Sequence, residues 1–201
     1  MKSILVLFAH PRLEKSRTNA VLLRSISHLP HVTVRDLYEE YPDYNIDIGR
    51  EKEHLLAHDI IVWHHPFYWY SCPPLLKQWI DMVLEIGWAY GPGGTALKGK
   101  LCFNAITTGG AREAYSREGR NRFSLREFLV PFEQTARLCQ MTYLPPFAVQ
   151  GTHRLTQEAI TRAGEQYALL LSRLAENSLS IEHLLTLETL NDEILQTSTE
   201  N

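Results

Sequence analysis

The sequence contains too few cysteines for a disulfide framework. Its 201 residues include three of them, Cys72, Cys102 and Cys139, which lie far apart and are odd in number. Proteins that depend on disulfides carry cysteines in larger, even numbers, whereas isolated thiols fit a reducing compartment. We therefore expect a cytoplasmic protein without disulfide bonds.

Long apolar runs and blocks of basic residues are also absent. No stretch approaches the roughly 20 apolar residues of a membrane-spanning helix. Residues 1–9 lack the length and the small-residue cleavage site of a signal peptide. The formal net charge is -3, without a dense Lys/Arg cluster. We therefore expect neither nucleic acid nor an anionic lipid surface as a partner on electrostatic grounds.

The usual nucleotide-binding glycine motifs are missing as well. The chain has no glycine-rich loop with a Walker lysine and no dinucleotide fingerprint. A nucleoside triphosphate held in the standard way is therefore not expected. The paired His54 and His58, and the group His10, His64 and His65, lack the spacing or further ligands of a metal centre, so no metal is predicted.

Apolar strand candidates alternate five times with amphipathic helix candidates. This alternation predicts one α/β domain, a doubly wound five-stranded parallel sheet of the flavodoxin-like kind, with strand order 2-1-3-4-5 and helices on both faces. Residues 1–176 form this domain, and residues 177–201 are expected to be a loosely attached tail or a dimer-contact helix. The strands are predicted at 3–9, 32–38, 60–63, 101–107 and 143–150, and the helices at about 17–29, 51–58, 75–84, 124–140 and from Thr156 onward.

The loop from His64 to Pro74 is rich in aromatic residues and proline. It follows a strand at the sheet edge where ligands of such folds bind, so its rings are candidates to face a flat, conjugated ligand. The alternative is a structural corner in which Trp69 and Tyr70 fill core volume.

Two further loops end at the same edge. The residues from Ser16 to Asn19 combine hydroxyl and amide groups, a cation and a helix amino terminus, which suit a phosphate, although they also form an ordinary helix cap. Thr107 to Gly110 offer small residues and free amides, or simply a tight turn. A phosphate seat, an aromatic wall and an amide-lined edge together favour flavin mononucleotide (FMN) and hydride transfer.

Several short motifs follow one another along the chain. They are His10-Pro11, Tyr41-Pro42-Asp43, Asn45-Ile46-Asp47-Ile48, Trp69-Tyr70-Ser71, Pro74-Leu75-Leu76-Lys77, Trp79-Ile80-Asp81, Gly87-Trp88-Ala89-Tyr90-Gly91 and Thr107-Thr108-Gly109-Gly110. Over residues 3–175 the chain resembles the flavodoxin-like NAD(P)H:quinone oxidoreductases, most of all the ancillary proteins of glutathione-regulated potassium-efflux systems.

The resemblance implies a homodimeric enzyme in which NAD(P)H reduces FMN, leaves, and is replaced by a quinone. It also implies binding to a potassium efflux antiporter at the cytoplasmic face of the inner membrane. FAD is an alternative cofactor, and a regulatory subunit with a structural or sensing flavin is an alternative role. The implied FMN-binding residues are His10, Ser16, Arg17, Thr18, Asn19, Phe67, Tyr68, Trp69, Tyr70, Thr107, Thr108, Gly109 and Gly110.

Tyr115 is the implied catalytic residue. Mammalian quinone reductases carry a tyrosine five residues, and a histidine eleven residues, after the second glycine of the Thr-Thr-Gly-Gly motif. Here these positions hold Tyr115 and Asn121. Tyr115 can donate a hydrogen bond, but a Tyr-His proton relay is not available, so water is the expected proton source.

Overall fold

The computed structural model describes residues 1–197. Six strands within this range form one sheet in which every pairing is parallel. The path β2-β1-β3-β4-β5 confirms the expected order, and β6 pairs with β4 farther along that strand. The strands are β1 (Ile4–Phe8), β2 (Val32–Asp36), β3 (Ile60–Pro66), β4 (Leu101–Thr107), β5 (Thr142–Tyr143) and β6 (Phe147–Val149).

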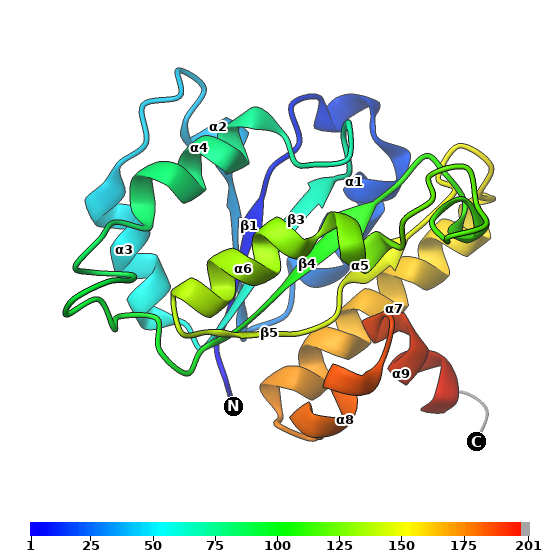
Figure 1. Ribbon diagram of the computed structural model, residues 1–201. Helices are drawn as coiled ribbons and strands as arrows, with labels where there is room; N and C mark the ends of the chain where they lie inside the picture. The colour runs from blue at the N-terminus through cyan, green and yellow to red at the C-terminus, as the bar shows by residue number, and fades with distance from the viewer. Residues whose placement is uncertain (198–201) are drawn as a thin grey trace.

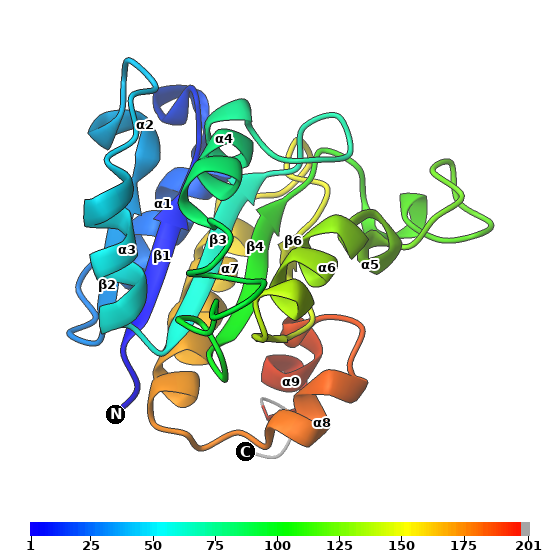
Figure 2. The same ribbon diagram turned by 60° about the vertical axis from the view of Figure 1, so that its left-hand side comes forward.

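Helices cover both faces of the sheet (Figures 1 and 2). The helices α1 (Arg17–Ile26) and α7 (Gln157–Ala175) pack together over one face. The opposite face carries α3 (Ile48–Ala57), α4 (Pro74–Val83), α5 (Leu125–Phe128) and α6 (Val130–Leu138), with the short α2 (Leu37–Glu40) beside α4. Within residues 1–197, no helix is both long and apolar enough to cross a lipid bilayer.

The central strands supply two hydrophobic cores. Every residue of β1 is buried, with Leu5 and Leu7 in the core under α3 and α4, and Ile4, Val6 and Phe8 in the core under α1 and α7. Successive side chains of a strand point to opposite faces, so a strand covered on both sides is apolar throughout. This explains why the continuous apolar run at 3–9 marked a central strand.

Several predicted boundaries were wrong for local reasons. The third strand does not stop at Trp63 but continues to Pro66, so His64 and His65 belong to the sheet. The second strand ends at Asp36, whose carboxylate accepts the Tyr38 amide hydrogen bond and caps α2. Helix α3 begins at Ile48, before the predicted start, because the Asp47 side chain caps it.

The last strand and the helix before it are each divided in two. Pro145 and Pro146 separate β5 from β6, since proline has no amide hydrogen to donate to a ladder. The helix predicted from Ser124 breaks at Leu129, just before Pro131, into α5 and α6. Its capping box is confirmed, because Ser124 and Glu127 exchange side-chain-to-backbone hydrogen bonds.

The chain beyond residue 176 folds into α8 (Ile181–Thr186) and α9 (Leu190–Thr197). Helix α9 packs against α7 and β6, and α8 lies next to α9 at the lower end of the molecule in both views (Figures 1 and 2). Leu184, Leu190 and Ile194 are buried in the core under α7. A loosely attached tail therefore does not describe residues 177–197, and residues 198–201 lie outside the described range.

A buried ion pair ties the edge strand β2 to the helices on one face. Both Arg35, on β2, and Glu51, on α3, are almost fully buried. Glu51 Oε1 accepts hydrogen bonds from Arg35 Nη2 at 2.6 Å and from the Tyr41 hydroxyl at 2.7 Å. Its second oxygen accepts from Trp79 Nε1, on α4, at 2.8 Å. One carboxylate thus satisfies donors from several segments.

We predict that Glu51→Gln lowers the free energy of unfolding by about 3 kcal/mol, because it leaves the Arg35 charge buried with only part of its compensation. Urea denaturation followed by tryptophan fluorescence measures this loss. Glu53→Gln, on the exposed side of the same helix, is the matched control and should shift the midpoint little. An equal shift in both variants would contradict the structural role of the pair.

Candidate cofactor and substrate site

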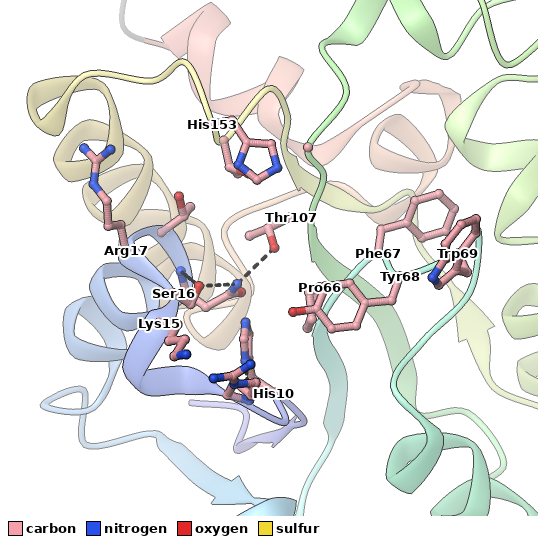
Figure 3. A pocket seen from close by; sticks show the side chains of 15 residues that line it. His10, Lys15, Ser16, Arg17, Pro66, Phe67, Tyr68, Trp69, Thr107 and His153 are labelled. Atoms are coloured by element: carbon pink, nitrogen blue, oxygen red, sulfur yellow. Dashed lines mark hydrogen bonds between the residues drawn. The ribbon is translucent and has the colours of Figure 1, made fainter.

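A cavity of about 750 Å³ opens at the carboxyl ends of β1, β3 and β4. Figure 3 shows residues from the β1–α1 loop on one side and the aromatic loop after β3 on the other, with Thr107 and His153 between them. The lining residues are His10, Arg12, Lys15, Ser16, Arg17, Thr18, Asn19, Pro66, Phe67, Tyr68, Trp69, Thr107, Gly109, Thr152 and His153.

The polar end of the cavity is the amino terminus of α1. Ser16 is the N-cap, and its hydroxyl accepts a hydrogen bond from the Asn19 amide nitrogen at 3.2 Å. The first amides of a helix have no partner within it and carry partial positive charge, which attracts anions. The exposed cations Arg12, Lys15 and Arg17 surround this terminus. The arrangement is able to hold a phosphate group.

Asn19 links the three elements that meet at this end. It is 2% exposed, and its Nδ2 donates to Ser16 Oγ and to Thr107 Oγ1, each at 3.0 Å. Its Oδ1 faces His64 Nε2 at 3.3 Å. The side chain therefore joins α1 to β3 and β4, and fixes the polar end relative to the sheet.

His10, at the end of β1, faces the cavity with a defined hydrogen-bonding pattern. Its Nδ1 accepts the Arg12 amide hydrogen at 3.1 Å, so the neutral ring carries its hydrogen on Nε2 and can donate it. Burial lowers the pKa of His10 below the ordinary value, which favours this neutral form at physiological pH.

The aromatic end of the cavity is a tight turn after β3. The Phe67 amide donates to Thr107 O at 2.8 Å, and the Ser71 amide donates to Tyr68 O at 2.9 Å, which closes the turn. Trp69 and Tyr70, at its tip, have φ values of 47° and 64°, a left-handed conformation that is strained for aromatic residues.

Trp69 is 93% exposed and Tyr70 49%. The alternative in which these two rings fill core volume is therefore wrong. A strained turn that presents an indole to solvent buries little apolar surface, so its conformation points to a binding role.

The two glycines after β4 lie close to neighbouring side chains. A Cβ atom on Gly109 would lie 2.8 Å from His153 Nε2, and one on Gly110 would lie 3.1 Å from the Tyr115 ring. Thr108 is buried, and its hydroxyl donates to Gly110 O at 2.6 Å. Thr108 thus shapes the loop without lining the cavity, and Gly109 keeps the space beside His153 open.

A second, smaller pocket of about 250 Å³ adjoins the aromatic turn. Tyr115 lies here, with its ring centre 6.0 Å from that of Phe67. Burial raises the pKa of the Tyr115 phenol, so the hydroxyl stays protonated at neutral pH and can donate a hydrogen bond. The lining residues are Phe67, Trp69, Tyr70, Gly110, Ala114, Tyr115, Arg120 and Asn121.

The structure brings together most of the residues singled out in the sequence. The first cavity includes His10, Ser16 to Asn19, Phe67 to Trp69, Thr107 and Gly109. Tyr70 and Gly110 line the second pocket, beside Tyr115.

Sequence reasoning missed Thr152 and His153, which line the first cavity. They follow β6, and every parallel strand of this sheet ends at the same edge. The loop after the last predicted strand was therefore the signal that could have found them.

Two buried histidines support the site from inside the sheet. Burial lowers the pKa of His64 to about 3 and that of His65 to about 4. His65 Nδ1 donates to Pro66 O at 2.9 Å, and its Nε2 accepts from Asn104 Nδ2 at 3.0 Å. Both rings are therefore neutral structural groups. The described residues contain no group of three metal-ligating side chains.

The chain is similar in sequence to known proteins. Residues 2–171 match the family described as having the flavodoxin-like fold. The ancillary protein KefG of the glutathione-regulated potassium-efflux system from Erwinia tasmaniensis is 44% identical over 164 residues, which cover 82% of this chain and 89% of that protein.

Two solved structures are also similar. General stress protein 14 from Treponema denticola, in complex with FMN, has a TM-score of 0.82 and 38% identity, covering 86% of this chain and 99% of that one. An NADPH-quinone reductase from P. pentosaceus has a TM-score of 0.77 and 32% identity, covering 86% and 97%. Similarity at this level supports a flavin-type oxidoreductase.

We predict that the free energy of unfolding decreases as the pH is lowered from 6.5 to 5. In this range the unfolded state protonates histidine, whereas the folded state keeps His64 and His65 neutral. The unfolded state then binds more protons, so stability decreases as the pH falls, by up to about 1.4 kcal/mol per pH unit for each histidine.

Urea denaturation at a series of pH values measures the slope. His64→Asn should remove one histidine's share of it, whereas His28→Asn, at an exposed position, should leave it unchanged. An unaltered slope in His64→Asn would show that His64 is not the group responsible.

Proposed function

This chain belongs to the family with the flavodoxin-like fold, and we propose that it is an FMN-dependent NAD(P)H:quinone oxidoreductase. The observation that carries the proposal is the difference between the two ends of the cavity. One end is a helix amino terminus with cations around it, and the other end is an aromatic turn. FMN has two matching ends, a phosphate and a conjugated ring system.

The residues present fit that cofactor. Ser16, Arg17 and Thr18 would hold the phosphate, and Asn19 would keep this segment in place. Phe67, Tyr68 and Trp69 would flank the ring system, and the opening beside Gly109 would admit its polar edge. A single phosphate seat favours FMN over FAD, and bound FMN supplies hydride transfer from NAD(P)H to a quinone.

The second pocket is the proposed place where NAD(P)H and the quinone bind in turn, in a ping-pong sequence. Tyr115 would donate a hydrogen bond to a substrate oxygen. The Tyr70 hydroxyl donates to Asn121 Oδ1 at 3.4 Å, so Asn121 is tied to the aromatic turn. An amide cannot relay a proton as an imidazole does, and water would therefore supply it.

A regulatory role is the second candidate, and the KefG similarity favours it. In that case a homodimer of this chain would bind a potassium efflux antiporter at the cytoplasmic face of a membrane, with the flavin serving as a structural or sensing group. The two roles are compatible in one protein. Turnover with NAD(P)H and quinone would distinguish the enzyme from a purely regulatory subunit.

We predict that the purified protein binds FMN and shows the visible absorption of an oxidised flavin. NADPH or NADH should bleach this absorption, and a soluble quinone should restore it. Chromatography of the heat-released flavin separates FMN from FAD. A protein that stays colourless and takes up no added FMN would overturn the proposal, whereas bound flavin without quinone-dependent recovery would favour the regulatory role.

We further predict that Trp69→Ala raises the dissociation constant for FMN about five- to tenfold, because a stacked aromatic ring contributes roughly 1 kcal/mol. Its stability should change little, since the indole is exposed. Tyr44→Ala is the matched control: Tyr44 is also an exposed aromatic residue with positive φ, but it does not line the cavity. Unchanged FMN affinity in Trp69→Ala would place the ring system elsewhere.

A further inference from the structure

The segment of residues 177–197, here called the C-terminal segment, is anchored in the core at several points. Leu184 and Leu190 are fully buried, and Ile194 is 1% exposed. Helix α9 packs against both α7 and β6. The family match ends at residue 171, so this anchored segment lies beyond the part that defines the fold.

The C-terminal segment also covers the outer edge of the sheet. The Ala148 amide, on β6, donates to Asn191 Oδ1 at 2.8 Å. The Leu190 amide donates to Pro146 O at 2.9 Å. An uncovered edge strand exposes unpaired amides and carbonyls, and these contacts satisfy part of that edge.

Two arginines connect the segment to the loop that carries Tyr115. Residues 109–128, here called the substrate loop, follow β4 and include α5, and the part before α5 projects from the molecule (Figure 2). Arg112, before Tyr115, lies with its Nη1 3.5 Å from Asp192 Oδ1. Arg126, after Tyr115, donates from Nη1 to Leu187 O at 3.0 Å. The segment thus holds the loop on both sides of Tyr115.

The anchoring groups on the segment are themselves fixed. Asp192 Oδ2 accepts hydrogen bonds from the Thr189 amide at 3.1 Å and the Thr189 hydroxyl at 3.0 Å, which orients the carboxylate facing Arg112. Charge adds to the fit, because the chain after residue 176 contains acidic residues and no lysine or arginine, whereas the substrate loop contains five arginines and three glutamates and is net positive.

We propose that the C-terminal segment is an intramolecular clamp that positions the substrate loop, with Arg112 and Arg126 as its positioning residues. The clamp would hold Tyr115 against Phe67 and so set the shape of the second pocket. Its effect on a quinone rests on the proposed function, but its effect on the loop does not. The clamp is therefore testable without flavin or substrate.

Limited trypsin digestion tests the loop directly, because Arg117, Arg120 and Arg122 are exposed on it. The double variant Arg126→Gln/Asp192→Asn removes the charge that pairs with Arg112 and the guanidinium that donates to Leu187 O. We expect cleavage at these three sites, followed by mass spectrometry, to be at least fivefold faster than in the parent. Arg162→Gln, at an exposed position on α7, is the control and should cleave at the parent rate.

Two results would overturn the clamp. One is an unchanged cleavage rate at the loop sites in the double variant. The other is an equal acceleration at Lys100 and Arg137, outside the loop, which would show general destabilisation. If the double variant does not fold, Asp192→Asn alone decides by the same comparison.

Kinetics provide a second readout once turnover is established. Loosening the loop should raise the KM for a soluble quinone severalfold while FMN content stays at the parent level, because the phosphate end lies at α1. A fall in FMN content with an unchanged KM would contradict the positioning role. Failure of the parent to turn over at all would affect the proposed function and leave the digestion result standing.

Discussion

The site depends on one buried asparagine. A parallel sheet brings several loops to the same edge, but adjacency alone does not fix their distances. Asn19 does so, because its amide bonds Ser16 on one side and Thr107 on the other, while its oxygen faces His64. In a region that excludes water, a satisfied network of this kind is strong and an unsatisfied one is costly. The polar end of the cavity is rigid for this reason.

The aromatic end of the cavity differs, because the side chains at the tip of its turn are exposed and not held by a buried network. Trp69 and Tyr70 are held in a left-handed turn, and much of their ring surface faces solvent. The turn persists because backbone hydrogen bonds fix both of its ends, and because β3 continues through His65 and Pro66, whose conformations are set by Asn104 and Thr107. A rigid polar seat and an exposed aromatic surface together suit a ligand that is charged at one end and flat at the other.

The sequence predicted the sheet order because five apolar runs alternate with helical patterns, and few topologies satisfy that alternation. It did not predict that β3 runs through His64-His65-Pro66, because histidine and proline indicate a loop locally. Pairing of His65 with Ile106 and of Pro66 with Thr107 on β4 decides the matter, and a local pattern does not contain the partner strand. The helix-cap pattern indicated Ser16 to Asn19. No local pattern indicated His153, because it lies in the loop after a strand that two prolines divide.

The groups that line the second pocket bear on the proposed reduction of a quinone. Tyr70, Tyr115, Arg120 and Asn121 offer hydrogen-bond donors and a positive charge, and none of the lining residues carries a carboxylate or an imidazole. In the proposed reaction a quinone oxygen would gain negative charge as the ring accepts a hydride, and donors and a cation would stabilise that change. The donors and the cation of this pocket therefore support the proposed acceptance of a hydride by a quinone.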